Sequence, residues 1–367
     1  MNSGEDLWPR VYGGRRVGKQ FEPGLVSVIV PTFNRERLVT EAMDSVWAQT
    51  YRPIELIVVD DGSTDGTVRV VEQWGREHAS DAAFTCRVVR QENRKVSAAR
   101  DLGAVESRGE YIQFLDSDDL LYPQRLAVMV GVARDTPGFQ VAVSDVLRTS
   151  FDGQAEMLVR QPDVTAPDRL RQVLRTPLAP YGAFYGRGFM RRVGFFNPEI
   201  SWGEDWEQGI RVAVACDPTR CRMVRQPLAN WRTHGGDRMT DVIERGASDE
   251  LLAPTVRALL RRPELSAEDY GTCVMVMLQL FMGRPRRGLV YLKWSFRLPC
   301  RRCLKLKLWM ATLIALVCGP ASAARILRWQ RRRRPGPLRP GRAWVPVHRD
   351  ESGRLVTRDG KPAYADG

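Results

Sequence analysis

Three aspartates stand within four residues, directly after a short apolar run. Asp116, Asp118 and Asp119 follow the segment YIQFL. Like charges this close repel one another, and a bound cation is the usual reason for gathering them. Carboxylate oxygens suit Mg²⁺ or Mn²⁺, which take their remaining ligands from phosphate and water. We predict a divalent cation here that neutralises a leaving diphosphate; an acidic loop that only caps a helix is the alternative.

A second carboxylate pair lies far from the first in the sequence. Glu204 and Asp205 stand between Trp202 and Trp206, at the expected start of a helix. Burial beside aromatic surface raises a carboxyl pKa, which suits a base that takes a proton from a hydroxyl group. The pair therefore predicts a catalytic base, and a helix-capping aspartate packed by tryptophans is the alternative.

Polar residues follow the first two expected strands, at residues 26–30 and 54–59. In a parallel α/β sheet, ligands bind beyond the carboxyl ends of the strands. Carboxylates and hydroxyls at these ends can bond the edge of a nucleotide base, and a glycine lets the backbone approach the ligand. Turns that cap helices are the alternative. The residues are Pro31, Thr32, Phe33 and Asn34 after the first strand, and Asp60, Asp61, Gly62 and Ser63 after the second.

Two further side chains are candidates for contact with phosphate. Arg100 lies near the expected start of a helix, where the helix dipole favours acids, so a phosphate or acidic partner would explain it. His234 lies in the Gly-rich stretch WRTHGGDRMT, where it would complete the metal site or touch phosphate. An ordinary loop histidine is the alternative.

Strands and helices must alternate along the first part of the chain to position these groups. Apolar β-branched runs alternate with segments of helical spacing, which predicts an α/β fold with a largely parallel central sheet. From residue 145 to 230, many Pro, Gly and aromatic residues predict loops of an acceptor site. The expected strands are 26–30, 54–59, 85–89, 111–115 and 140–144, and the expected helices are 36–49, 67–78, 97–107 and 124–133.

The net charge of +13 comes from the C-terminal part of the chain. Between Asp269 and Asp350 there are 18 Lys and Arg residues and no Asp or Glu. Residues 308–324 carry no charge, but they are shorter than the roughly 20 residues needed to span a bilayer. We expect residues 284–342 to bind an anionic membrane surface peripherally. Nucleic-acid binding and plain solubility are the alternatives, and we do not expect nucleic acid.

The N-terminal segment and the cysteines indicate the cellular compartment of the protein. The segment MNSGEDLWPRVYGG has no apolar core of a signal peptide, so we expect a cytoplasmic protein at the inner face of the membrane. Seven scattered cysteines argue against a disulfide framework and suit a reducing compartment.

In its ordered set of motifs, the chain resembles the family 2 glycosyltransferases. The resemblance runs from about Val26 to Thr240 and implies a GT-A fold, a Rossmann-like domain that binds nucleotide sugars. It rests on VSVIVPTFNRE, ELIVVDDGSTDGT, SAARDLGA, EYIQFLDSDD, VGFFNPE, GEDWE and WRTH.

The resemblance implies a role for each group. Thr32 and Asp61 would contact the base of a UDP- or dTDP-type donor. Asp116 and Asp118 look like the DxD metal pair, with Ser117 between them against the nucleotide. Asp205 corresponds to the catalytic base beside Glu204, with a metal and Arg100 stabilising the leaving diphosphate. His234 is similar in place to a histidine that some members use near the diphosphate.

The implied activity is the transfer of a hexosyl group from a nucleotide-sugar donor to a hydroxyl of a glycan or lipid-linked acceptor. The transfer would invert the anomeric centre and would serve cell-envelope polysaccharide synthesis. A non-catalytic sugar-nucleotide-binding protein on the same fold is the alternative. The expected domains are an N-terminal arm (1–24), the GT-A domain (25–245), a helical extension (246–330) with a membrane-surface segment at 304–327, and a loosely ordered tail (331–367). Within the GT-A domain, a nucleotide half (25–145) precedes an acceptor half (146–245).

Overall fold

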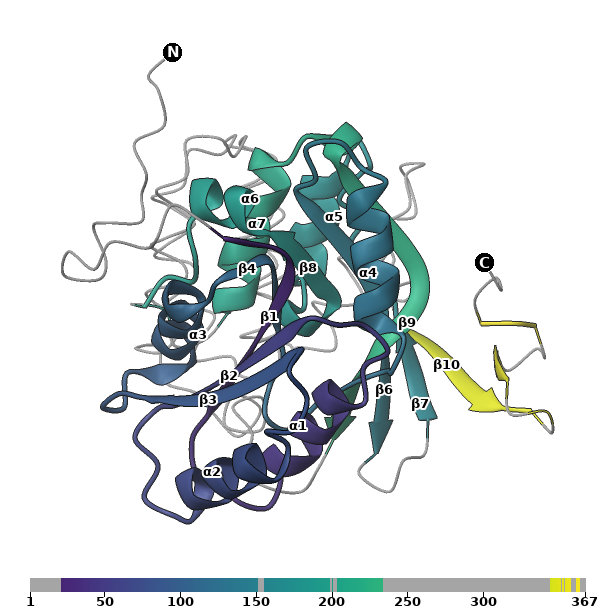
Figure 1. The fold of residues 1–367 in the computed structure, drawn as a ribbon. Helices are drawn as coiled ribbons and strands as arrows, with labels where there is room; N and C mark the ends of the chain where they lie inside the picture. The colour runs from purple at the N-terminus through teal and green to yellow at the C-terminus, as the bar shows by residue number, and fades with distance from the viewer. Residues whose placement is uncertain are drawn as a thin grey trace, which may run out of the picture.

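The computed structural model describes residues 21–150, 155–198, 200, 203–233, 344–350, 352, 354–357 and 361–363. These residues build one large sheet with helices on both of its faces (Figure 1). The main path of the sheet has the strand order β11-β10-β7-β6-β8-β4-β1-β2-β3. Strand β9 joins this path by pairing with β6, and β5 pairs with β9. The α/β architecture predicted from the sequence is confirmed.

Four parallel strands form the part of the sheet that leads to the candidate site. They are β1 (Glu22–Thr32), β2 (Ile54–Asp60), β3 (Phe84–Arg90) and β4 (Gly109–Phe114). In the register, Thr32 lies opposite Asp60, and Ile29 lies opposite Phe114. The carboxyl ends of β1, β2 and β4 therefore meet at one edge, and the polar residues after them come together there.

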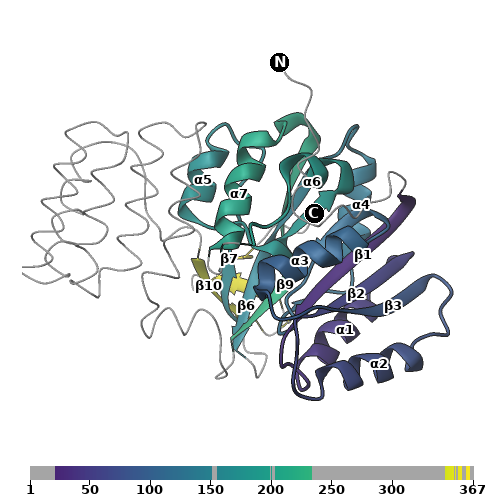
Figure 2. The same ribbon diagram turned by 90° about the vertical axis from the view of Figure 1, so that its left-hand side faces the viewer.

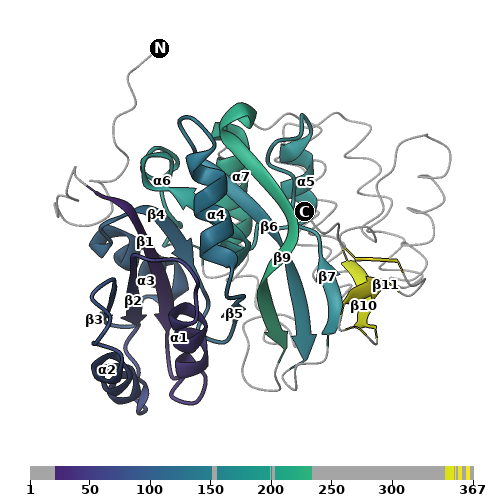
Figure 3. The same cartoon turned by 45° about the vertical axis from the view of Figure 1, so that its right-hand side comes forward.

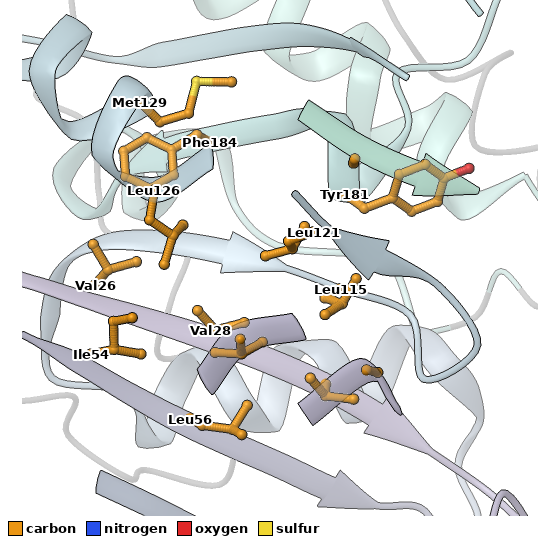
Figure 4. Packing of buried hydrophobic residues seen from close by; sticks show 14 of the residues in the cluster. Val26, Val28, Ile54, Leu56, Leu115, Leu121, Leu126, Met129, Tyr181 and Phe184 are labelled. Atoms are coloured by element: carbon orange, nitrogen blue, oxygen red, sulfur yellow. The ribbon is translucent and has the colours of Figure 1, made fainter. Parts of the chain in front are cut away.

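The apolar runs form strands because both faces of the sheet are covered. Val28 belongs to the cluster that holds α1 (Val39–Trp47) and α2 (Thr67–Glu77), as Figure 4 shows in part. Ile29 belongs to the opposite cluster, with α3 (Lys95–Glu106). Figure 2 shows α1 and α2 across the sheet from α3. Strands buried on both faces read as continuous apolar runs, so β1 and β2 were predictable.

The second half is more regular than the expected loops. Its strands are β5 (Leu120–Leu121), β6 (Val141–Ser150), β7 (Ala155–Val159), β8 (Ala183–Gly186) and β9 (Cys221–Thr233). Its helices are α4 (Arg125–Arg134), α5 (Arg169–Arg175), α6 (Arg187–Val193) and α7 (Glu204–Ala215), with 3₁₀ turns η2 (Pro180–Gly182) and η3 (Pro218–Arg220). Figure 3 shows β6, β7 and β9 side by side. Strand β6 pairs antiparallel with β7 and β8 and parallel with β9.

The C-terminal tail, expected to be loosely ordered from residue 331, returns to the sheet, so that expectation is wrong for part of it. Strand β10 (Trp344–Arg349) pairs antiparallel with the edge strand β7, and β11 (Leu355–Thr357) pairs with β10 (Figure 1). Val347 and Leu355 join a small apolar cluster with Leu158. A local pattern could not reveal this, because the pairing partner lies nearly 200 positions earlier in the chain.

Several predictions concern residues outside this description. These are the arm up to residue 20, His234, the helical extension at 246–330 with its segment 304–327, and most of the basic tail. Within the described ranges, no helix is long and apolar enough to cross a membrane. Strand β1 begins at Glu22, inside the expected arm, and β9 ends at Thr233.

Candidate active site

The loops after β1 and β2 fold together as one unit. The Asn34 backbone N–H donates to Ser63 Oγ, and the Thr64 backbone N–H donates to Asn34 Oδ1, both at 2.9 Å. Asn34 adopts a left-handed φ of 52°, which asparagine tolerates better than most residues. Asn34 and Ser63, both predicted to face a nucleotide, are thus brought together at the sheet edge.

The two aspartates after β2 have different surroundings. Asp60 is fully buried, where it accepts bonds from the Ser63 backbone N–H and from Arg90 Nε. Asp61 Oδ1 accepts bonds of 2.7 Å from Gln91 Nε2 and from the Arg94 backbone N–H. Asp60 is therefore occupied in shaping the loop, whereas Asp61 Oδ2 makes no hydrogen bond to a described residue.

The other predicted nucleotide residues line the same edge. Pro31 and Thr32 are buried, and Thr32 Oγ1 has no hydrogen-bond partner among the described atoms. Phe33 is 43% exposed. Gly62 has φ 81°, and a Cβ there would lie 3.0 Å from the Asn93 backbone nitrogen, so only glycine fits this turn.

The acidic segment after β4 forms a tight turn whose three aspartates differ. Asp119 is buried and accepts a 2.9 Å bond from the Arg232 backbone N–H of β9. Arg232 Nε also donates to the Asp118 carbonyl at 2.7 Å, and its guanidinium pairs with Glu41. Asp119 and Arg232 therefore hold the turn in place, and the carboxylates of Asp116 and Asp118 are partly exposed. Ser117 between them is buried.

Arg100 joins this acidic turn to the start of α7. Its Nη2 lies 2.6 Å from Asp116 Oδ1, and its Nη1 lies 2.9 Å from Glu204 Oε1. The Arg100 side chain is 4% exposed and lies over the Phe196 ring at 4.9 Å. Burial alone would lower the pKa of Arg100, but the charges of Asp116 and Glu204 outweigh it and raise the pKa above its ordinary value. Arg100 lies mid-helix in α3, and its two Nη groups are bonded to carboxylates.

Asp205 lies in the first turn of α7, as predicted. Gly203 precedes the helix with a left-handed φ of 74°, and Trp206 is buried with its Nε1 donating to the Val173 carbonyl at 3.0 Å. Burial and the adjacent Glu204 charge raise the pKa of Asp205 to about 7, and Arg100 limits the rise. A carboxyl with this pKa can accept a proton near neutral pH.

The chain is similar in sequence to known proteins over much of its length. The family model "Glycosyl transferase family 2" matches residues 27–193. The chain is 28% identical over 217 residues to an uncharacterised glycosyltransferase of Nostoc sp., a match that covers 58% of this chain and 66% of that one. It is 28% identical over 245 residues to the uncharacterised glycosyltransferase EpsJ of Bacillus subtilis, covering 64% and 68%. Residues 27–193 therefore form a family 2 glycosyltransferase domain.

A solved structure supports the fold of this glycosyltransferase. Residues 1–349 of S. aureus TarS, crystallised in complex with UDP-GlcNAc, align with a TM-score of 0.60 at 17% identity, over 93% of this chain and 99% of that chain. The likeness shows a GT-A-like fold. The chain spans about two thirds of the length of the first two curated relatives and less than half of several others.

The acidic turn of the candidate site has carboxylates of the kind that would hold a divalent cation together with a diphosphate. No group of three His, Cys, Asp or Glu side chains is arranged for a metal within the described part of the chain. Mg²⁺ is commonly held by one or two carboxylates and by substrate phosphates. Asp116 and Asp118 are both partly exposed, so together they supply two carboxylates for such an ion. His234, the third predicted ligand, lies outside the described residues.

Two residues that lie beside the candidate site were not predicted from the sequence. Arg232 had no signal, because its partners Asp119 and Glu41 are 113 and 191 positions away. Tyr181 stands in the segment APYGAF, which has no recognisable motif. Its pKa is raised well above the ordinary value by burial and by the charges of the acidic turn and Asp205. Tyr181 therefore lies within the electrostatic reach of both carboxylate groups.

Proposed function

We propose that this glycosyltransferase moves a sugar from a nucleoside-diphosphate sugar to an acceptor hydroxyl by a single inverting displacement. One observation carries the proposal: Arg100 connects the acidic turn after β4 to the start of α7. The turn proposed to bind the diphosphate and the carboxyl proposed as the base are thereby held near each other. That arrangement is what a direct displacement at the anomeric carbon requires.

The nucleotide would bind across the ends of β1 and β2. The exposed Phe33 ring offers a stacking surface for a base, and Asp61 Oδ2 offers an acceptor to its edge. Asn34 and Ser63 fix the two loops that carry these groups. A UDP-type donor is supported by TarS, which was crystallised with UDP-GlcNAc and with UDP.

Asp116 and Asp118 would hold Mg²⁺ or Mn²⁺ against the diphosphate. When bound, such an ion neutralises the charge of the leaving nucleoside diphosphate. Asp205 would take the proton of the acceptor hydroxyl, since its pKa of about 7 matches that task. Glu204 and Arg100 position the site: the guanidinium fixes Glu204 beside Asp205 and keeps the pKa of Asp205 from rising further.

The acceptor would be a glycan or lipid-linked glycan at the inner membrane surface. The basic residues between 284 and 342 surround an apolar segment, Leu308–Val317, a composition that favours anionic lipid. Strand β10 returns the chain to the catalytic domain directly after this segment. The basic segment would therefore keep the catalytic domain close to its membrane-bound acceptor.

Donor hydrolysis tests the proposed function. The wild-type chain should release nucleoside diphosphate from at least one of UDP-GlcNAc, UDP-glucose, UDP-galactose, dTDP-glucose or GDP-mannose when Mn²⁺ or Mg²⁺ is present. Asp118→Ala should lose this activity. Asp135→Ala, which removes an exposed carboxylate at the end of α4, should keep it. Tight donor binding without turnover would instead support a non-catalytic sugar-nucleotide-binding protein.

A further inference from the structure

Tyr181 combines a buried ring with a hydroxyl group that has no hydrogen-bond partner among the described residues. The residue lies in the 3₁₀ turn η2, is 9% exposed, and shares the apolar cluster of Leu115 and Leu121. Figure 4 shows the phenol oxygen pointing away from that cluster. No described residue forms a hydrogen bond with this oxygen, and it is absent from the described atoms that are both buried and unpartnered. The hydroxyl oxygen therefore retains some exposed surface.

Three contacts fix the position of Tyr181 relative to the acidic turn. Gln113 Nε2, on β4 just before Asp116, donates to the Tyr181 carbonyl at 3.3 Å. The Gly182 N–H closes the turn on the Ala179 carbonyl at 2.9 Å. A Cβ on Gly182 would lie 3.3 Å from the Ser144 carbonyl, so the turn packs tightly on β6. These contacts fix the backbone that carries Tyr181, and a rigid backbone helps a side chain to select among ligands.

The surroundings of the phenol keep it protonated. Besides burial, the charges of four carboxylates raise the pKa of Tyr181 well above its ordinary value. Three of them belong to the acidic turn and the fourth is Asp205 of α7. A neutral phenol is a hydrogen-bond donor and acceptor. Both groups of acids therefore lie within electrostatic range of the phenol.

We propose that Tyr181 contacts the sugar that is transferred, donating its O–H to a hydroxyl or acyl oxygen of that sugar. The inference rests on the proposed function and deepens it. If the diphosphate lies at Asp116 and Asp118 and the acceptor hydroxyl at Asp205, the sugar occupies the space between them. Tyr181 would then contribute to the choice of sugar, whereas the residues after β1 and β2 choose the nucleotide.

Tyr181→Phe tests this with little change in packing, because only the hydroxyl is removed. The matched control is Tyr111→Phe, which removes a phenol oxygen from the same apolar cluster at the start of β4, away from the acidic turn. Calorimetry with Mg²⁺ would measure the Kd of UDP-GlcNAc and of UDP for each protein. If another donor of the panel is hydrolysed faster than UDP-GlcNAc, that donor and its nucleoside diphosphate replace UDP-GlcNAc and UDP in this experiment.

We expect Tyr181→Phe to bind UDP as the wild type does and to bind the sugar nucleotide about three- to tenfold more weakly, the size of one neutral hydrogen bond. Tyr111→Phe should change neither Kd. Unchanged sugar-nucleotide binding in Tyr181→Phe would overturn the inference, and so would an equal loss for both ligands, which indicates a structural role. A wild-type chain that binds no sugar nucleotide of the panel and none of the corresponding nucleoside diphosphates would instead contradict the proposed function.

Discussion

Arg100 Nη1 lies 2.9 Å from Glu204 Oε1, a contact between residues 104 positions apart. The same guanidinium pairs with Asp116. A buried arginine of α3 therefore joins the acidic turn after β4 to α7, the helix that carries the proposed base Asp205. The sequence predicted all three residues and left either a phosphate or an acidic partner for Arg100, which has two acidic partners in the structure. The structure indicates a positioning role, in which one cation compensates two carboxylates that would otherwise repel each other.

Arg100→Gln should impair both stability and activity. Removing one partner of a buried ion pair leaves uncompensated charge, at a cost of about 3 kcal/mol. The pKa of Asp205 should rise because Arg100 lowers it, so the acid limb of the pH–rate profile should move to higher pH. Chemical denaturation and initial rates from pH 5 to 9 would measure these effects. Arg220→Gln, in an exposed ion pair with Asp217, is the control and should change little. An unshifted acid limb in active Arg100→Gln would contradict the positioning role.

Asp205→Asn should abolish most transfer and yet stabilise the fold at alkaline pH. A general base contributes about 10²- to 10⁴-fold in rate, and nucleotide binding should persist without it. The folded-state pKa of Asp205 is raised to about 7, so its favourable contribution is present below the unfolded pKa of about 3.9 and is lost as the pH rises through 7. A neutral Asn avoids that loss. The Tm of Asp205→Asn should therefore exceed the wild-type Tm by about 2 °C or more at pH 8 and match it near pH 4.

The control for this experiment is Asp135→Asn, an exposed change at the end of α4. It should leave the rate and the pH dependence of Tm as in the wild type. Near wild-type transfer by Asp205→Asn would show that another group is the base.

Thr32→Val should stabilise the free protein and weaken nucleotide binding. Thr32 Oγ1 is buried without a described partner, and an unsatisfied hydroxyl costs about 1 kcal/mol or more. We expect Thr32→Val to have a higher denaturation midpoint than the wild type. We also expect it to bind UDP about three- to tenfold more weakly, provided that the loop moves on binding so that the ligand reaches Oγ1. Thr136→Val is the contrast, because Thr136 Oγ1 already donates to the Val132 carbonyl at 2.8 Å and its loss should destabilise. Wild-type UDP affinity in Thr32→Val would remove Thr32 from the nucleotide site.

The basic tail should bind anionic membranes through its charge. Changing Arg331, Arg332, Arg333 and Arg334 to Gln should weaken sedimentation with phosphatidylserine-containing vesicles at least tenfold at low salt, since each basic residue near the surface contributes about 1 kcal/mol. The matched variant with four Lys residues should bind as the wild type does, and pure phosphatidylcholine vesicles should bind neither. Equal partitioning of the Gln variant and the wild type would refute the membrane proposal.

The sequence was most informative where local pattern and burial agree. The run 26–30 and the next strand are largely apolar because helices cover both faces, and their polar ends mark the site edge. The two polar exceptions, Ser27 and Glu55, are buried and hydrogen-bond each other. Links between distant segments could not be predicted: β10 depends on β7, and Arg232 holds Asp119 from 113 positions away. Such contacts depend on the complete fold and leave no periodic signal.

The central claim is that the turn after β4 binds a divalent ion together with a diphosphate. Calorimetric titration of UDP into the wild type and into Asp118→Ala, with Mn²⁺ and with EDTA, tests it most directly; dTDP and GDP serve as further ligands. The account predicts that Mn²⁺ tightens binding of at least one nucleoside diphosphate to the wild type by about tenfold or more, and that Asp118→Ala loses this gain. Binding that is equally tight with Mn²⁺ and with EDTA, for every nucleoside diphosphate, would contradict it.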